Sequence, residues 1–206
     1  DWSAPYPHVS MPLSLPGNRV LLSLGYGKGS KLLQVDFVDG IFSATELWKS
    51  IRMKAKFTNL VFHDDHIFGL DDGMFACIDA QRGHRKWKDG PYGHGQILLA
   101  QSHLIIQCEN GDLALTKATP ESHQQIARLP ALAGKTWNNP ALANGRLYLR
   151  NDQKMICYDI RPGSAAGSVT LNPSTGEALS VLAAAFFLLN GLGCIGLGCF
   201  VRPTSE

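Results

Sequence analysis

The sequence predicts an all-β fold of small antiparallel sheets, and three observations support that prediction. Short apolar runs, such as HIFGL, MFACID and HLIIQC, alternate with clusters rich in Asp, Asn and Gly, which is typical of strands joined by tight turns. The connections between the runs are too short for the crossover helices that a parallel sheet requires. Finally, 21 glycines, 11 prolines and only 17% charged residues disfavour an all-helical protein.

The runs also repeat along the chain, with a period of about 40 residues. The turns at 71–73, 109–111 and 151–153 occupy equivalent places, and a looser copy begins at residue 19. Each copy has the size of a four-stranded blade, and neighbouring blades bury each other's sheet faces. We therefore expect residues 1–161 to form a partial β-propeller of about four four-stranded antiparallel blades.

The stretch CIDAQRGHRKW, residues 77–87, predicts how neighbouring blades join. Asp79 follows a strand and can accept hydrogen bonds from the N–H groups of the next turn, and Gly83 supplies the positive φ that closes this turn. Trp87 falls on the outer strand, where its indole can dock on the next blade. The stretch therefore predicts a clip between blades.

The other copies vary this clip. Trp48 is the expected equivalent of Trp87 in the preceding blade, after Asp36 and Gly40. In the third copy Thr116 and Lys117 stand where the acid is expected, and the stretch TKATPESHQQIARL contains no tryptophan.

These residues resemble the A-x-D-x-x-T-G-x-x-x-W tryptophan-docking repeat of quinoprotein-type β-propellers, with Cys77 in place of Ala and Arg82 in place of Thr. The segments GYGKGSKLLQV, PYGHGQILLA and KTWNNPALANGRLYLRN are similar to the bacterial PQQ-binding-like β-propeller repeat proteins. Because full members of this family have more blades, the resemblance implies a partial chain. A first residue of Asp1 fits the same expectation.

Two functions are consistent with this resemblance. The leading one is a membrane-tethered, non-catalytic propeller that binds a protein partner or a small ligand on one propeller face. The alternative is a PQQ-dependent alcohol or sugar dehydrogenase, which would need PQQ and calcium. Enzymes of that kind carry adjacent cysteines beside the quinone, and this sequence has no Cys-Cys pair. The resemblance thus implies the scaffold rather than the cofactor, and no catalytic residue is nominated.

The character of the chain changes after Arg161. Residues 162–178 are small and polar and are expected to form a linker. Residues 179–201 contain no charge and have the length of a transmembrane helix, followed by a short tail at 202–206. Arg202 then favours an extracytoplasmic propeller. The GLGCIG motif at 191–196 lacks a strand context for dinucleotide binding, and a net charge of +2 gives no case for nucleic acid.

Two glycine-rich loops, GYGKG and YGHG, bring candidate residues toward the propeller axis, although glycine could simply relieve crowding there. The predicted channel-lining residues are Tyr26, Lys28, Tyr92, His94, Trp137, Asn138 and Arg150. Among them, His94 is the one possible acid–base group.

The stretch His63-Asp64-Asp65-His66 is interpreted as a hairpin turn, and no metal site is predicted. Cys77 and Cys157 are expected as small buried residues, with the disulfide state left open.

Overall fold

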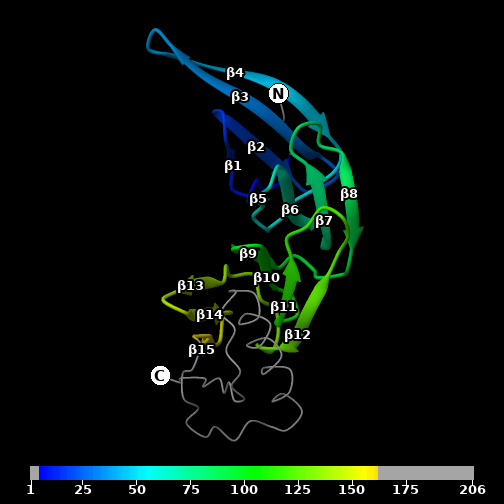
Figure 1. Cartoon of the computed structure of the whole chain (residues 1–206), viewed down its shortest axis with the longest axis vertical. Coiled ribbons are helices and arrows are strands. Elements are labelled where there is room, and N and C mark those ends of the chain that lie inside the picture. Colours follow the sequence, from blue (N-terminus) through cyan, green and yellow to red (C-terminus); the bar gives the residue numbers. More distant parts are fainter. Residues whose placement is uncertain (1–4, 162–206) are drawn as a thin grey trace, which may run out of the picture.

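The structure, a computed structural model, describes residues 5–161, and in this range it consists of strands, turns and loops. The strands form four antiparallel sheets that follow one another along the chain (Figure 1). Blade 1 comprises β1 (Leu13–Leu15), β2 (Arg19–Leu24), β3 (Gly29–Val38) and β4 (Ile41–Ser50). Blade 2 comprises β5 (Val61–His63), β6 (His66–Asp71), β7 (Met74–Asp79) and β8 (Arg85–Asp89). Blade 3 comprises β9 (Gln96–Ala100), β10 (His103–Gln107), β11 (Asp112–Lys117) and β12 (Gln125–Pro130). Blade 4 comprises β13 (Ala141–Ala143), β14 (Arg146–Arg150) and β15 (Met155–Asp159).

The expected all-β class is confirmed, and each sheet is a meander of consecutive strands, as in a propeller blade. Figure 1 shows the four sheets side by side in an open arc. Three of the sheets have the four expected strands, and blade 4 has three strands within residues 5–161. The expected segments 162–178, 179–201 and 202–206 lie outside the described residues. Within residues 5–161 no helix has the length and apolarity needed to cross a membrane.

Three apolar clusters hold consecutive blades together. Because side chains alternate along a strand, adjacent residues of the middle strands belong to different clusters. Ile67 on β6 joins the cluster between blades 1 and 2, whereas the next residue, Phe68, joins the cluster between blades 2 and 3. Ile105 and Ile106 on β10 divide in the same way between the last two clusters. This explains why the inner strands are apolar on both faces.

The turn after β7 has the geometry that its sequence indicates. The Asp79 carboxylate accepts hydrogen bonds from the backbone N–H groups of Arg82 at 2.7 Å and His84 at 2.9 Å. Gly83 has a φ of +68°. The backbone N–H of Asp79 also donates to the carbonyl of His84, at 2.9 Å. Blade 3 has the equivalent bond, from the N–H of Lys117 to the carbonyl of Gln124 at 3.0 Å, but Lys117 supplies no carboxylate to this turn.

One tryptophan links each of the first two blades to the blade that follows it. The indole of Trp48 donates to the carbonyl of Ala80 at 3.1 Å, and its ring lies against Gly83. The indole of Trp87 donates in the same way to the carbonyl of Thr119 in blade 3, at 3.0 Å. Each indole therefore covers the turn between the third and fourth strands of the next blade.

The expected turn before Trp48 differs in detail. Asp36 lies within β3 and accepts a hydrogen bond from the Gln34 side chain, at 3.2 Å. The turn itself is Asp39-Gly40, with φ of 53° and 80°, a two-residue connection typical of tight hairpins. As a result, β3 and β4 extend as a long arm beyond the rest of blade 1 (Figure 1).

Replacing Gly83 by Ala should destabilise the fold by about 2–3 kcal/mol, since it adds a clash to the cost of a positive φ. A Cβ at this position would lie 2.7 Å from the Trp48 ring. Gly40→Ala is the matched control, because Gly40 also has a positive φ but no atom within 4 Å of the added Cβ. Urea unfolding of both variants should show the larger loss for Gly83→Ala. Equal losses would contradict a role for the Trp48 contact.

Candidate functional site

One end of the blade stack gathers all connections between blades. In each four-stranded meander the first strand begins and the fourth strand finishes at the same end of the sheet. The connections 51–60, 90–95 and 131–140 therefore lie at that end, together with the turns between second and third strands. We call this surface the linker face. Sequence-distant side chains are brought together on it.

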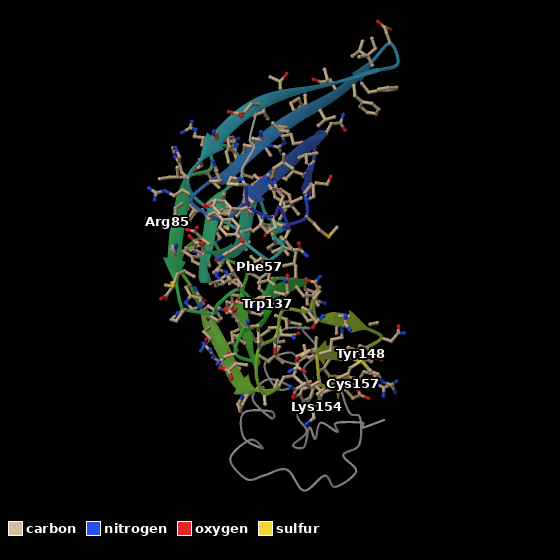
Figure 2. The ribbon with its side chains drawn as sticks, turned by 180° about the vertical axis from the view of Figure 1, so that it is seen from behind. Phe57, Arg85, Trp137, Tyr148, Lys154 and Cys157 are labelled. Carbon is tan, nitrogen blue, oxygen red and sulfur yellow. The ribbon has the colours of Figure 1, made fainter. Side chains whose placement is uncertain are left out.

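Three aromatic rings from three different connections meet on the linker face. The Phe57 and Trp137 rings are tilted at 33° with centroids 5.0 Å apart, and both residues are labelled near each other in Figure 2. The His94 ring meets Phe57 edge-on at 5.8 Å. Trp137 remains 41% exposed, so part of its ring is available for a ligand.

Two lysines complete this arrangement. The Lys56 ammonium lies 4.7 Å from the ring centroid of Tyr26 and 5.5 Å from that of Phe57. The Lys135 ammonium lies 4.4 Å from the Trp137 ring. Cations over ring faces are attracted by the ring quadrupole, which holds these flexible side chains near the aromatic groups. The set Tyr26, Lys56, Phe57, Trp137 and Lys135 is called the aromatic–lysine row below.

Glu109, in the turn between β10 and β11, fixes the row from one side. Its carboxylate accepts hydrogen bonds from the backbone N–H of His94 and the indole N–H of Trp137, both at 2.9 Å. Burial of the carboxylate opposes its charge, but these hydrogen bonds outweigh burial and hold the pKa of Glu109 below its ordinary value. Gly93 permits the approach, since a Cβ there would lie 2.5 Å from the Cβ of Glu109.

Gln96, which is buried at the start of β9, holds the backbone beneath the row. Its side-chain amide donates to the carbonyls of Phe57 at 2.6 Å and Trp137 at 3.2 Å. Its amide oxygen accepts from the N–H of Asn59 at 3.2 Å. The connections before blades 2 and 4 are therefore both tied to blade 3, and the row is preorganised.

The structure brings only some of the predicted channel-lining residues together. Tyr26 and Trp137 belong to the aromatic–lysine row, and His94 contacts it. Tyr92 instead lies in the core, 3% exposed, with its hydroxyl group within hydrogen-bond distance of His123 and Gln125.

The other predicted residues are more peripheral. Lys28 and Asn138 are half-buried in a turn and a connection of the linker face. Arg150 is exposed at the end of β14, and its carbonyl accepts a hydrogen bond from Gln107 at 3.0 Å.

Sequence reasoning missed Lys56, Phe57, Gln96 and Glu109. A signal for Phe57 was present, because Phe57, Tyr92 and Trp137 each precede the first residue of the next blade by the same spacing. The contacts of Glu109 had no local signal, since its partners lie far away in the sequence.

The described residues do not assemble a set of His, Cys, Asp or Glu side chains that could hold a metal ion. Asp64 and Asp65 form the hairpin turn between β5 and β6, with φ of 46° and 59°. Within residues 5–161 no group of three His, Cys, Asp or Glu side chains converges as metal ligands would.

Cys77 and Cys108 are buried, and burial disfavours the thiolate form of both side chains. Burial raises the pKa of Cys77 to about 12 and that of Cys108 to about 11. Cys157 is half-buried, and all three are free.

Comparisons with known proteins found partial structural likeness only. No protein-family model matches the sequence, and no curated protein sequence matches it. Among solved structures, BamB from Moraxella catarrhalis is 16% identical with a TM-score of 0.47, over 72% of this chain and 41% of that chain. The computationally designed Ika8 protein is 12% identical with a TM-score of 0.49, over 73% of this chain and 58% of that chain. This chain therefore spans less than half of the BamB chain.

Proposed function

We propose that this chain is a non-catalytic binding module and that its linker face captures an extended, acidic segment of a partner protein. The observation that supports this is the aromatic–lysine row, built by the turn between β2 and β3 and by the connections 51–60 and 131–140. Exposed aromatic rings offer area at low entropic cost, and lysine ammonium groups select carboxylates. Because Glu109 and Gln96 already hold the row in place, a ligand would find it preorganised.

We further propose that the module is tethered to a membrane by residues 179–201 and acts outside the cytoplasm. The uncharged composition of that segment and the position of Arg202 support the proposal. Accessibility of an introduced cysteine to an impermeant thiol reagent in intact cells would test the side on which the propeller lies.

Replacing Trp137 by Ala should weaken binding of a peptide in which Glu alternates with Leu by roughly tenfold, because the ring supplies the central contact. Titration calorimetry on the full chain measures this, and added salt should weaken wild-type binding. Phe42→Ala is the control, since Phe42 is also an exposed aromatic residue but lies on the arm of blade 1, away from the linker face.

Three outcomes would contradict the proposal. The first is equal peptide affinity in Trp137→Ala and wild type, and the second is no peptide binding by either protein. The third is dye-linked alcohol or sugar oxidation after reconstitution with PQQ and calcium, which would favour the dehydrogenase alternative.

A further inference from the structure

A hollow of about 230 Å³ lies at the junction of blades 1 and 2. Its walls come from two segments that are distant in the sequence, the end of β4 and the turn between β7 and β8. The lining residues are Ser50, Arg52, Gly83, His84 and Arg85. Figure 2 shows Arg85 on the outer strand of blade 2, away from the labelled rings of the aromatic–lysine row. The hollow is therefore a different surface from that row.

Hydrogen bonds hold the two walls of the hollow together. The Ser50 hydroxyl donates to the carbonyl of Gly83 at 3.2 Å and accepts from the backbone N–H of Arg52, also at 3.2 Å. The Ser30 hydroxyl donates to the carbonyl of Arg52 at 2.9 Å. The backbone that carries the first arginine is thus fixed on both sides, so a ligand would meet a preformed site.

The hollow is basic and has no acid of its own. Arg85 is the cross-strand partner of Ile78, which packs toward blade 1, so both side chains leave the sheet on the side of the hollow. Within residues 5–161 no carboxylate forms an ion pair with Arg52 or Arg85. The acid of this turn, Asp79, already accepts hydrogen bonds from two backbone N–H groups. Two guanidinium groups therefore share one hollow without a counter-ion.

The junction of blades 2 and 3 shows how the chain balances a base at the corresponding place. Ser50 and Asp89 are equivalent, because each follows by two residues the tryptophan that docks on the next blade. The backbone bonds that close the two turns make His123 the counterpart of Gly83. Asp89 lies 2.7 Å from Nδ1 of His123 and so supplies an acid from within the chain. Between blades 1 and 2 a hydroxyl group replaces that acid, and the arginines remain unpaired.

We propose that this hollow binds a phosphate group, either as inorganic phosphate or as the phosphate of a small organic molecule, between Arg52 and Arg85. Two unpaired guanidinium groups raise the local positive potential and attract an anion. A planar carboxylate is satisfied by one guanidinium in a two-bond pair, whereas the oxygens of a tetrahedral phosphate point in several directions and can accept from both walls. The imidazole of His84, exposed at the rim, can donate a further hydrogen bond.

Titration calorimetry of the full chain, in a phosphate-free buffer at constant ionic strength, tests this site. Inorganic phosphate and glycerol 3-phosphate are the two probes, and each should bind saturably at one site per chain. Arg52→Gln and Arg85→Gln should each weaken binding roughly tenfold, because each removes charge-assisted hydrogen bonds to the phosphate. Arg82→Gln is the matched control, since it removes the same charge from the same turn but Arg82 does not line the hollow. Its affinity should equal that of the wild type.

The two probes also separate the two sources of the phosphate. Tighter binding of glycerol 3-phosphate would assign the hollow to an organic phosphate, and equal binding would mean that the phosphate group alone is recognised. Ser50→Asp places at this junction the acid that the next junction has, so it should abolish binding of both probes while the far-ultraviolet circular dichroism spectrum stays unchanged.

Several results would overturn the proposal. They are the absence of saturable binding of both probes to the wild type, unchanged affinity in Arg52→Gln and Arg85→Gln, and acetate binding as tight as that of phosphate. An equal loss of affinity in Arg82→Gln and Arg85→Gln would also overturn it, because it would show a diffuse attraction to the basic turn rather than a site in the hollow.

Discussion

Trp87→Ala is expected to lower the free energy of unfolding by about 3 kcal/mol, a large share of the 5–15 kcal/mol typical of a domain. The indole of Trp87 fills the contact between blades 2 and 3, with its ring centroid 4.9 Å from that of Phe75 and 5.8 Å from that of His123. It also donates to the carbonyl of Thr119. Truncation therefore leaves a cavity and an unpaired carbonyl in the same place.

Urea unfolding followed by far-ultraviolet circular dichroism measures this loss. Trp87→Phe keeps much of the packing but removes the indole N–H, so it should cost less than half as much. Were Trp87→Ala as stable as the wild type, the tryptophan would not join the blades.

The clip around Asp79 was readable from the sequence because all its parts are local. A carboxylate, a glycine with positive φ and a tryptophan on the next strand lie within one stretch of chain, and turn chemistry dictates their arrangement. The period of the strands was predictable because its signals are local too. Each blade is a meander whose turns carry their own signals.

The aromatic–lysine row was less predictable because its contacts join separate blades. Phe57 and Trp137 meet only when blade 3 ties their connections together through Gln96. Tyr92 has the same spacing from its blade but belongs to the shorter connection 90–95, and it packs into the core. Its partner His123 comes from the connection between β11 and β12, and no sequence pattern there predicts this contact.

Asp71→Asn is expected to cost about 2 kcal/mol at neutral pH, because it breaks a buried ion pair network. The Asp71 side chain is 1% exposed and lies 2.7 Å from the ammonium groups of both Lys54 and Lys88. Lys54 belongs to the connection between blades 1 and 2 and Lys88 to the outer strand of blade 2, so the carboxylate fastens the connection to the blade. The two lysine side chains are 21% and 24% exposed, and this partial solvation keeps the expected loss below that of a fully buried pair.

The pH dependence of this loss follows from the direction of the pKa shift. Burial opposes the charge of Asp71, but hydrogen bonds from Lys54 and Lys88 outweigh burial and hold the pKa of the carboxyl below its ordinary value of 3.8. A lowered pKa in the folded state means that the carboxylate contributes its full stability above pH 3.8 and loses it as the pH falls through the folded pKa. The difference in stability between wild type and Asp71→Asn should therefore be constant near neutrality and shrink below pH 3.8.

Asp72→Asn provides the control for this experiment, since Asp72 is the next residue, is exposed and occupies a turn with φ of 52°, which asparagine tolerates. Its stability should follow that of the wild type across the whole pH range in urea unfolding. A stability difference between wild type and Asp71→Asn that grows on acidification would contradict the assigned role. It would mean that the carboxyl group is held in its protonated form, and that the two lysines fasten the connection by other contacts.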